Sequence, residues 1–189
     1  MSLPWTFDAP IRTQRLVIRP MTPGDLDDVY AYQSDQDNHR YLLNDARSRE
    51  EVVEAVGRYA SARRLADEKD WIQPAVELDG RVIGQLFLTI VSVDNRGAEV
   101  GWVFHPDFQG RGYATEAATA LFDLAFGELG MHRIRAELDP KNAASIALCR
   151  RLGMREEAFF VKDVWLRGRW DDSGIYAILE EEWAARRSL

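Results

Sequence analysis

Cysteine, histidine and long apolar runs are scarce in this 189-residue sequence. It contains one cysteine, Cys149, and three histidines, so no intrachain disulfide can form, and no Cys/His pattern has the spacing of zinc ligands. No apolar run approaches the roughly 18–20 residues of a membrane span, and the N-terminus has no signal-peptide pattern. We therefore expect a cytoplasmic protein without a bound metal ion and without a membrane partner.

Internal repeats, low-complexity tracts and linkers are also absent from the sequence. Hydrophobic residues make up 46% and charged residues 29% of the chain, as in ordinary globular proteins. A chain of this length is expected to form one domain, residues 1–189, and to bury roughly 70% of the surface of the unfolded chain.

An excess of basic residues is missing as well. The 24 lysines and arginines are outnumbered by 31 aspartates and glutamates, which gives a formal net charge of −7. Nucleic-acid binding depends on clustered positive charge, so a nucleic-acid partner is not expected. The negative charge suits a cationic substrate, and it equally suits solubility alone.

Two helices are predicted in the N-terminal part, over residues 25–35 and 48–70. Thr22 is a typical N-cap for the first helix. Ser48 and Glu51 have the spacing of a capping box and mark the start of the second.

A β-meander follows, and after it helices alternate with strands. Asp79 and Gly80, between two β-branched runs, are a strong signal for a hairpin turn. Antiparallel strands that lead into a strand–helix–strand–helix unit predict a mixed α/β sheet. The predicted strands are residues 14–21, 71–78, 81–93, 98–104 and 133–140, with a hairpin over 159–179, and the later helices are 114–129 and 142–153.

The segment HPDFQGRGYATEA, residues 105–117, connects a predicted strand to a predicted helix. A helix N-terminus carries unpaired N–H groups and the positive end of the helix dipole, which together favour an anion. Gly110 and Gly112 let an oxygen atom approach the backbone and allow positive φ. A dinucleotide fingerprint would need glycine at Thr115, and a G-K-[ST] loop is absent. We predict that this loop holds a pyrophosphate; a plain packing turn is the alternative.

The same segment resembles a family signature. QGRGYATEA resembles the Q/R-x-x-G-x-G/A motif of the GNAT N-acetyltransferase superfamily, with Gln109, Gly112 and Ala114 in the motif positions. Residues 139–154, DPKNAASIALCRRLGM, resemble the family segment N-x-x-S-x-x-L-x-x-x-x-G-F/M. The ending GRWDDSGIYAIL resembles that of the ribosomal-protein N-terminal acetyltransferase branch. The resemblance covers about residues 13–180.

This resemblance implies a single-domain GNAT-like fold with a splayed mixed sheet, and acetyl-coenzyme A as the co-substrate. The pyrophosphate would bind to the glycine loop, and the pantetheine arm would lie along a strand edge and the start of a helix. The implied binding residues are Val103, Phe104, Gln109, Gly110, Arg111, Gly112, Tyr113, Ala114, Thr115, Asn142, Ser145 and Cys149.

Acetyl transfer requires a neutral amine, and the cost of removing its proton depends on its pKa. At pH 7 this cost is about 4.6 kcal/mol for a lysine amine and about 1 kcal/mol for an α-amino group. Glu99, in the strand that leads to the loop, is the first candidate for the general base, and His105 is the second. A purely structural role is the alternative for both.

The departing thiolate takes up a proton, and a helix face offers candidates for the donor. Asn142, Ser145 and Cys149 follow i, i+3, i+7 spacing and share one face. Many family members have a tyrosine at the position of Cys149 that protonates the thiolate, and this chain lacks it. Ser145 is therefore the candidate acid, and for Cys149 a core position is the alternative.

Several acceptors remain open at this point. The branch resemblance and the pKa comparison favour the N-terminal α-amino group of a protein or peptide, and a small amine is the other candidate. From a different class of function, a non-catalytic module that senses acetyl-coenzyme A is the alternative. Exposed sheet edges and six tryptophans are compatible with a homodimer.

Overall fold

The computed structural model describes residues 2–42 and 44–187 of the chain. The strands are β1 (Trp5–Thr6), β2 (Ile11–Arg12), β3 (Val17–Arg19), β4 (Arg64–Leu65), β5 (Trp71–Ile72), β6 (Ala75–Leu78), β7 (Arg81–Ser92), β8 (Gly97–Phe104), β9 (Arg133–Leu138), β10 (Arg155–Leu166) and β11 (Arg169–Leu179). The helices are α1 (Leu26–Gln33), α2 (Arg49–Ser61), α3 (Tyr113–Asp123), α4 (Ala143–Leu152) and α5 (Glu180–Arg187).

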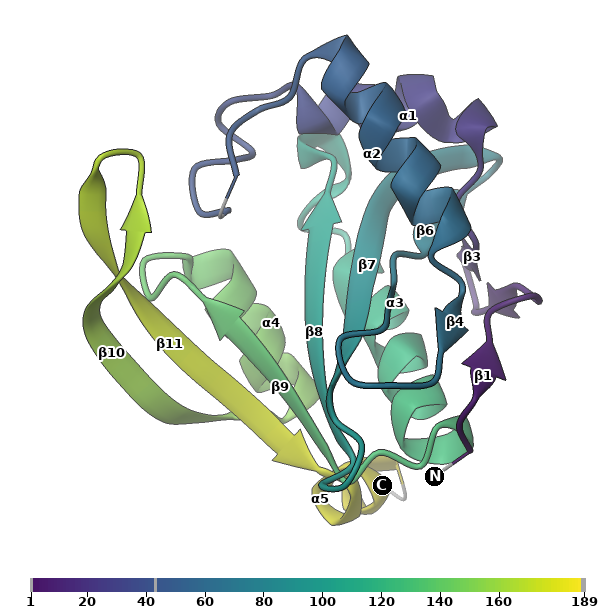
Figure 1. Cartoon of the computed structure of the whole chain (residues 1–189), viewed down its shortest axis with the longest axis vertical. Helices are drawn as coiled ribbons and strands as arrows, with labels where there is room; N and C mark the ends of the chain where they lie inside the picture. Colours follow the sequence, from purple (N-terminus) through teal and green to yellow (C-terminus); the bar gives the residue numbers. More distant parts are fainter. Residues whose placement is uncertain (1, 43, 188–189) are drawn as a thin grey trace.

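One large mixed sheet forms the centre of the molecule (Figure 1). Its strands follow the order β10-β11-β9-β8-β7-β6-β3-β2, β5 also pairs with β7, and β1 and β4 form a separate ribbon. The pair β8–β9 is parallel, and the other pairs of the sheet are antiparallel. The predicted mixed α/β architecture is therefore confirmed.

The hairpin turn between β6 and β7 shows how the local sequence sets the register. Leu78 pairs with Arg81, and the two residues between them, Asp79 and Gly80, have φ of 51° and 82°. Two consecutive residues with positive φ are typical of a type I′ turn, whose twist matches that of the flanking strands. The predicted meander is present in β6, β7 and β8.

The second helix is shorter than the sequence predicts. Its capping box is present, because Ser48 Oγ accepts a hydrogen bond from Glu51 N. α2 nevertheless ends at Ser61, several residues before the predicted end, and the chain turns so that Leu65 pairs with Trp5 and is fully buried. Burying a leucine side chain stabilises the fold by roughly 1.5–3 kcal/mol, more than helix propensity contributes over a few exposed residues.

The strand predicted over residues 71–78 is divided into β5 and β6. Pro74 lies between them and has no N–H with which to continue a strand ladder. Its carbonyl still accepts a hydrogen bond from Leu86 N at 2.9 Å, so the chain stays against β7 on both sides of the proline.

The C-terminal helix α5 is absent from the sequence-based prediction. Trp183 anchors it: its ring packs against Phe122 and Phe126, and its Nε1 donates to Asp123 Oδ1 at 2.9 Å. The helix thereby covers the far end of α3 and of the π-helical turn that follows it at Leu124–Glu128.

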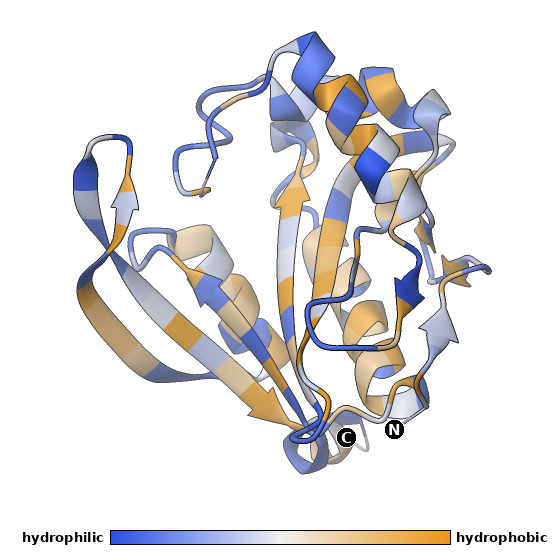
Figure 2. Ribbon diagram, in the orientation of Figure 1, coloured by the Kyte–Doolittle hydropathy of each residue, from blue (hydrophilic) through white to orange (hydrophobic). Residues whose placement is uncertain are grey.

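Two hydrophobic clusters lie on the two faces of the sheet. The larger joins α3, α4 and α5 to the central strands, and the smaller joins α1 and α2 to β6 and β7. In Figure 2, hydrophobic segments follow β7 and α3, whereas α2 alternates between hydrophilic and hydrophobic segments. This alternation is that of a surface helix with one buried stripe.

The sheet opens between β8 and β9. Their parallel register runs only from Gly97 opposite Arg133 to Glu99 opposite Arg135, and beyond it the two strands diverge (Figure 1). β9 keeps β11 as its neighbour along its whole length. The C-terminal half of β8 is therefore left with one edge unpaired, and this edge faces a V-shaped gap.

Candidate active site

The glycine loop between β8 and α3 has a left-handed backbone at both glycines. Gly110 and Gly112 have φ of +73° and +82°, a conformation that residues with a Cβ adopt only at a cost. Gly112 is the N-cap of α3, and no side chain caps this helix end. The first N–H groups of α3 are therefore available to a ligand at the positive end of the helix dipole.

Gln109 fixes the loop to the end of β8. Its Nε2 donates to Phe104 O at 3.1 Å, and its main-chain N–H donates to Pro106 O. Within the described residues, the next N–H groups, from Gly110 to Thr115, have no main-chain acceptor. The N–H of Gln109, one of the expected binding residues, is thus already used, and the free backbone donors begin at Gly110.

Three arginines surround the start of α3. Arg15 lies over the ring of Tyr113, with its Cζ 4.5 Å from the ring centroid, and its Nη1 donates to Arg111 O at 3.0 Å. Arg151 Nε donates to Thr115 Oγ1 at 3.3 Å. The guanidinium of Arg15 is paired with Glu116 at 2.6 Å, whereas those of Arg111 and Arg151 lie beside the free N–H groups, an arrangement that suits a phosphate. The loop residues expected to bind pyrophosphate are thus brought together, with Ala114 packed against the core.

The unpaired edge of β8 presents the main-chain groups of every second residue. His105 N donates to Ile83 O of β7, and the regular register of the two strands gives Val103 the same orientation. Main-chain groups alternate along a strand, so those of Trp102 and Phe104 point into the gap. The N–H of Val103 is directed to β7, and Val103 faces the site through its side chain.

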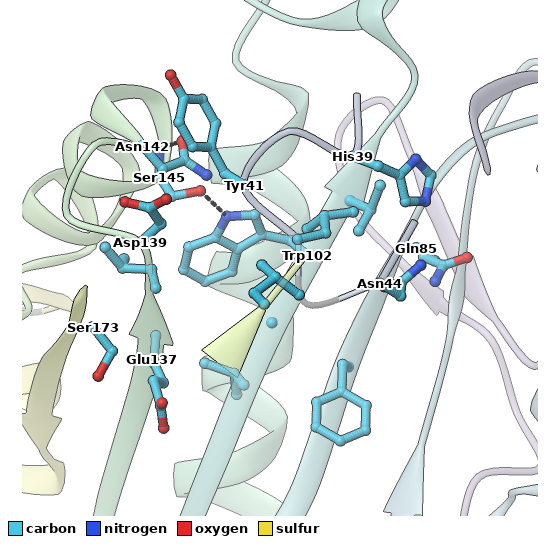
Figure 3. Close-up of a pocket in the computed structure, with 18 of the residues that line it drawn as sticks. His39, Tyr41, Asn44, Gln85, Trp102, Glu137, Asp139, Asn142, Ser145 and Ser173 are labelled. Carbon is cyan, nitrogen blue, oxygen red and sulfur yellow. Dashed lines mark hydrogen bonds between the residues drawn. The ribbon is translucent and has the colours of Figure 1, made fainter. Parts of the chain in front are cut away.

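A cavity of about 360 Å³ lies at the mouth of the gap. β7 and β8 form its floor, and its two walls come from distant parts of the chain (Figure 3). One wall is the segment between α1 and α2, with His39, Tyr41 and Asn44. The other is β9, the start of α4 and the β10–β11 hairpin, with Glu137 and Ser173. Ligand sites commonly have volumes of about 300–1,000 Å³.

Asn142 and Ser145 lie together at the start of α4. Asn142 caps the helix, because its Oδ1 accepts a hydrogen bond from Ser145 N at 3.0 Å. Ser145 Oγ accepts a hydrogen bond from Trp102 Nε1 at 3.2 Å, and Figure 3 shows this bond across the gap. Both residues line the cavity. Among the described residues, the hydroxyl of Ser145 has no hydrogen-bond acceptor.

Cys149 does not reach this cavity. Its side chain is fully buried in the larger hydrophobic cluster, and burial raises the pKa of its thiol to about 12. Although spacing puts Cys149 on the face of Asn142 and Ser145, it lies deeper along α4, where that face packs against the core. A thiol in this position is neutral at physiological pH.

Glu99 lies at the closed end of the gap and is already paired. Arg135 donates to Glu99 Oε2 from Nε at 2.9 Å and from Nη2 at 2.7 Å. Glu99 is outside the residues that line the cavity, which on β8 begin at Val100. His105 Nδ1 accepts a hydrogen bond from Asp107 N at 3.2 Å and serves as the cap of the short turn after β8.

Glu137, which the sequence prediction missed, is the carboxylate that faces the cavity beside the gap. It lies two residues beyond Arg135 on β9, on the same face of the sheet as Glu99, and lines the cavity. Within the described residues its carboxylate has no hydrogen bond or ion pair. Desolvation raises its pKa, the negative charge of Glu99 adds to this effect, and Arg135 opposes it. The alternation in RIRAEL shows that Arg135 and Glu137 share a face, but not which strand lies beside them.

The opposite wall rests on a buried hydrogen-bond network. Gln85 Oε1 accepts from Tyr32 Oη and from Gln33 Nε2, both at 2.9 Å. Arg47 Nη1 donates to Gln33 Oε1 at 2.6 Å and to Tyr59 Oη at 2.5 Å. Because buried polar networks are rigid when every member is bonded, this wall is held in one shape.

Within residues 2–42 and 44–187, no three His, Cys, Asp or Glu side chains are grouped so as to hold a metal ion. The same residues include no helix that is both long and apolar enough to cross a membrane.

Comparison with known proteins identifies the family. Residues 15–155 match the model of the acetyltransferase (GNAT) domain. The chain belongs to the GNAT family. It is 34% identical over 173 residues to the uncharacterized N-acetyltransferase YnaD of Bacillus subtilis (strain 168), covering 92% of this chain and 98% of YnaD. A GNAT-family acetyltransferase structure from Bacillus anthracis superposes with a TM-score of 0.82 at 31% identity, covering 92% of this chain and 99% of that one.

GNAT enzymes use acetyl-coenzyme A, and the chain is an acetyl-coenzyme A-dependent N-acetyltransferase. The alternative of a non-catalytic sensor gains no support from these relatives.

The spermidine N(1)-acetyltransferase of Escherichia coli (strain K12) is 25% identical over 168 residues, covering 89% of this chain and 88% of that protein. The putative ribosomal N-acetyltransferase YdaF of Bacillus subtilis (strain 168) is 29% identical over 125 residues, covering 66% and 68%. The expected ribosomal-protein branch is therefore supported only weakly.

Proposed function

We propose that this GNAT enzyme acetylates a small cationic primary amine, which enters the cavity beside the gap and gives up its proton to Glu137. The observation that carries this proposal is the unpaired carboxylate of Glu137 at the point where β8 and β9 diverge. The pKa of Glu137 is raised, which brings it closer to the pKa of the amine that gives up the proton. A general base works best when its pKa lies near the working pH.

The glycine loop and the gap fit acetyl-coenzyme A. Free N–H groups from Gly110 to Thr115, with Arg111 and Arg151 nearby, would hold the pyrophosphate. Asn142 retains its side-chain N–H donors at the mouth of the gap and would bind the amides of the pantetheine arm. When bound, acetyl-coenzyme A supplies the thioester carbonyl that the amine attacks.

The main-chain N–H groups of Trp102 and Phe104 would stabilise the charge that develops on the thioester oxygen. They point into the gap from the unpaired edge of β8. Fixed backbone donors in a site that excludes water stabilise a transition state by about 3–4 kcal/mol each in the best-studied cases.

Proton transfer is divided between two side chains. Glu137 first takes one proton from the ammonium group, directly or through a water molecule, and passes it to solvent, so that the neutral nitrogen can attack and form the C–N bond. It then takes the second proton from the same nitrogen. The C–S bond then breaks, and the Ser145 hydroxyl donates a proton to the departing sulfur and regains one from solvent. Glu99, the base expected from the sequence, would act indirectly: its negative charge helps to keep the pKa of Glu137 raised.

The charge of the cavity favours a cationic acceptor. Four acidic side chains line it, Glu137, Asp139, Asp171 and Asp172, whereas Arg47 is the one lining lysine or arginine among the described residues. Asp171 is paired with Arg169 and Lys141, so three of these carboxylates carry no ion pair within the described residues. Arg47 is hydrogen-bonded within the opposite wall. A concave site with an excess of one sign of charge concentrates ligands of the other sign, and the likeness to a spermidine acetyltransferase over 89% of the chain agrees with this choice.

The size of the cavity favours a small or extended acceptor. One space of about 360 Å³ must hold the acetyl end of the co-substrate together with the amine. A flexible N-terminus of a peptide is the second candidate, because YdaF is a relative and an α-amino group costs only about 1 kcal/mol to neutralise at pH 7.

A thiol-release assay tests the proposal. The protein is first titrated with acetyl-coenzyme A by calorimetry, and free thiol is then measured with aliphatic polyamines, amino acids, aminoglycosides and peptides that have a free α-amino group. We expect binding, and the fastest release with polyamines. Release with peptides alone would replace the small amine by an N-terminus, and binding without any release would contradict the proposal.

A homodimer, with which the sequence is compatible, stays a prediction. β10 is an edge strand of the sheet, and Phe159, Phe160 and Val161 on it are exposed. An apolar edge strand is a surface that proteins usually cover. Sedimentation equilibrium of the purified chain measures whether a second copy covers it.

A further inference from the structure

Arg167, at the tip of the β10–β11 hairpin, is hydrogen-bonded to the segment between α1 and α2, which forms the opposite wall of the cavity. Its guanidinium nitrogen atoms lie 2.6–3.2 Å from five oxygen atoms of that segment. These are Asp45 Oδ1 and the main-chain oxygens of His39, Arg40, Leu42 and Asn44. Within the described residues, Arg167 makes every polar contact between the hairpin and this segment.

The hairpin turn places the arginine in this position. Arg167 and Gly168 have φ of +50° and +75° and form the two-residue turn between Leu166 and Arg169. Arginine rarely adopts a left-handed backbone conformation, because its Cβ atom disfavours positive φ. Guanidinium, with five N–H donors in one plane, suits a cluster of carbonyl oxygens better than an ammonium does.

The contact joins the two walls across the mouth of the cavity. His39, Tyr41 and Leu42 line it on one side, and Val164 and Leu166 line it on the other. Figure 1 shows the hairpin tip beside the segment between α1 and α2. The other hydrogen bonds of this segment run mainly back to α1 and its C-terminal end, from Asn38 Nδ2 to Tyr32 O, from Arg47 N to Gln33 O, and between His39 Nδ1 and Asp35 O. One long hydrogen bond, from Gln109 Nε2 to Asn38 Oδ1 at 3.4 Å, reaches the segment from the glycine loop.

We propose that Arg167 sets the size limit for the acceptor, an inference that rests on the proposed function. By tying the two walls together it keeps the mouth narrow, so that a slender amine is held close to Glu137 and a bulky acceptor is kept out. Arg167 touches neither the gap nor the glycine loop. It acts on acceptor binding and leaves the chemical step and the binding of acetyl-coenzyme A unaffected.

The Asp45 carboxylate alone does not account for the contact. It is two-thirds exposed, and exposed ion pairs contribute little. The contact depends mainly on the four main-chain carbonyl oxygens, because the guanidinium must lie among them to reach all four. Asp45→Asn is therefore expected to keep most of the size limit, and Arg167→Lys to lose most of it.

The test compares Arg167→Ala with Arg155→Ala. Arg155 is a second arginine of the hairpin, bound to Glu157 and Glu182 at its other end, far from the mouth. The acceptors are a diaminoalkane and a decapeptide with a free α-amino group, and kcat and KM are measured for each. Because the two walls are no longer tied together, the diaminoalkane is held less closely, and its KM is expected to rise about tenfold in Arg167→Ala. kcat is expected to stay near its wild-type value, KM for the decapeptide to fall, and Arg155→Ala to change neither KM.

The outcomes separate this inference from the function on which it rests. If the wild type shows no amine-dependent thiol release, the proposed function fails and the size limit fails with it. If the wild type is active but Arg167→Ala keeps the wild-type ratio of the two KM values, Arg167 is only structural. Amide hydrogen exchange of residues 39–42 gives an independent reading: it should accelerate in Arg167→Ala and in Arg167→Lys, but not in Arg155→Ala, and unchanged exchange in all three would overturn the proposal.

Discussion

The two ends of the proposed ligand site are built in different ways. The proposed phosphate end is one continuous segment, residues 105–117, in which a strand end, two left-handed glycines and a helix start follow one another. The proposed acceptor end is the cavity, which is assembled from segments far apart in the sequence, around residues 33–42, 44–47, 85–87, 137–145 and 164–173. The proposed phosphate end is thus encoded locally, whereas the proposed acceptor end depends on how distant parts of the chain come together.

Gly112→Val should give the largest effect, at the phosphate end. The φ of +82° and a new side chain at the N-cap would both disturb the free N–H groups of α3. Affinity for acetyl-coenzyme A is expected to fall about 100-fold or more, the equivalent of two or three lost net hydrogen bonds. Calorimetric titration measures this loss.

Gly80→Val is the matched control, because Gly80 has the same φ of 82° but lies in the β6–β7 turn, where an added Cβ would meet no atom within 4 Å. It carries the same backbone strain without touching the site. Normal affinity in Gly112→Val, or an equal loss in Gly80→Val, would mean that the loop does not hold the pyrophosphate.

Glu137→Gln should give the next largest effect, at the acceptor end. Removal of a general base usually lowers the rate by about 10²–10⁴-fold, and affinity for acetyl-coenzyme A should not change. Glu99→Gln is the control, because its carboxylate is already bound to Arg135 outside the cavity. A larger loss of kcat in Glu99→Gln than in Glu137→Gln would return the role of the base to Glu99.

The raised pKa of Glu137 predicts a dependence of stability on pH. A carboxyl group whose pKa is higher in the folded than in the unfolded chain binds its proton more tightly when folded. The stability that it contributes is full below the unfolded pKa and is lost as the pH rises through the folded pKa. Glu137→Gln should therefore be more stable than the wild type at neutral pH, and this advantage should disappear in acid. Urea unfolding at two pH values measures the difference, and an equal difference at both would contradict the raised pKa.

Glu99 and Glu137 also show what the sequence could and could not predict about the site. Alternation along each strand places each glutamate on the face now observed. Which of the two is the better candidate for the general base depends on two features of the tertiary structure: β9 lies beside β8, and the strands separate after Glu99 and Arg135. The first fact supplies the arginine that neutralises Glu99, and the second opens the space in front of Glu137.

The same distinction applies to the fold. The β6–β7 turn and the start of α2 follow from short-range signals, Asp79-Gly80 and the Ser48–Glu51 capping box, and both were predictable. The end of α2 and the presence of α5 depend on burial against distant segments, of Leu65 beside β1 and of Trp183 beside α3. Neither burial is visible in the sequence of the segment itself.

Ser145→Ala should give a smaller effect, on turnover rather than on co-substrate binding. A thiol with a pKa of about 8.5 leaves readily as a thiolate, so the loss of a proton donor is expected to lower kcat only about tenfold. The mutation also removes the acceptor of the Trp102 Nε1–H. Trp102→Phe separates the two roles, because it breaks the same hydrogen bond and keeps the serine hydroxyl. Equal losses in both variants would make Ser145 a positioning residue.

Cys149→Ala should give the smallest effect on activity. The thiol is buried in the core, and its pKa of about 12 keeps it neutral, so it has no proton-transfer role near pH 7. Removal of one buried sulfur atom is expected to cost about 1 kcal/mol of unfolding free energy and to leave kcat unchanged, as steady-state kinetics and thermal unfolding would show. A tenfold loss of kcat with normal stability would mean that the thiol reaches the reaction. An unchanged kcat would support the division of this helix face. Asn142 and Ser145, in the first turn of α4, line the cavity, and Cys149, in the next turn, packs in the core.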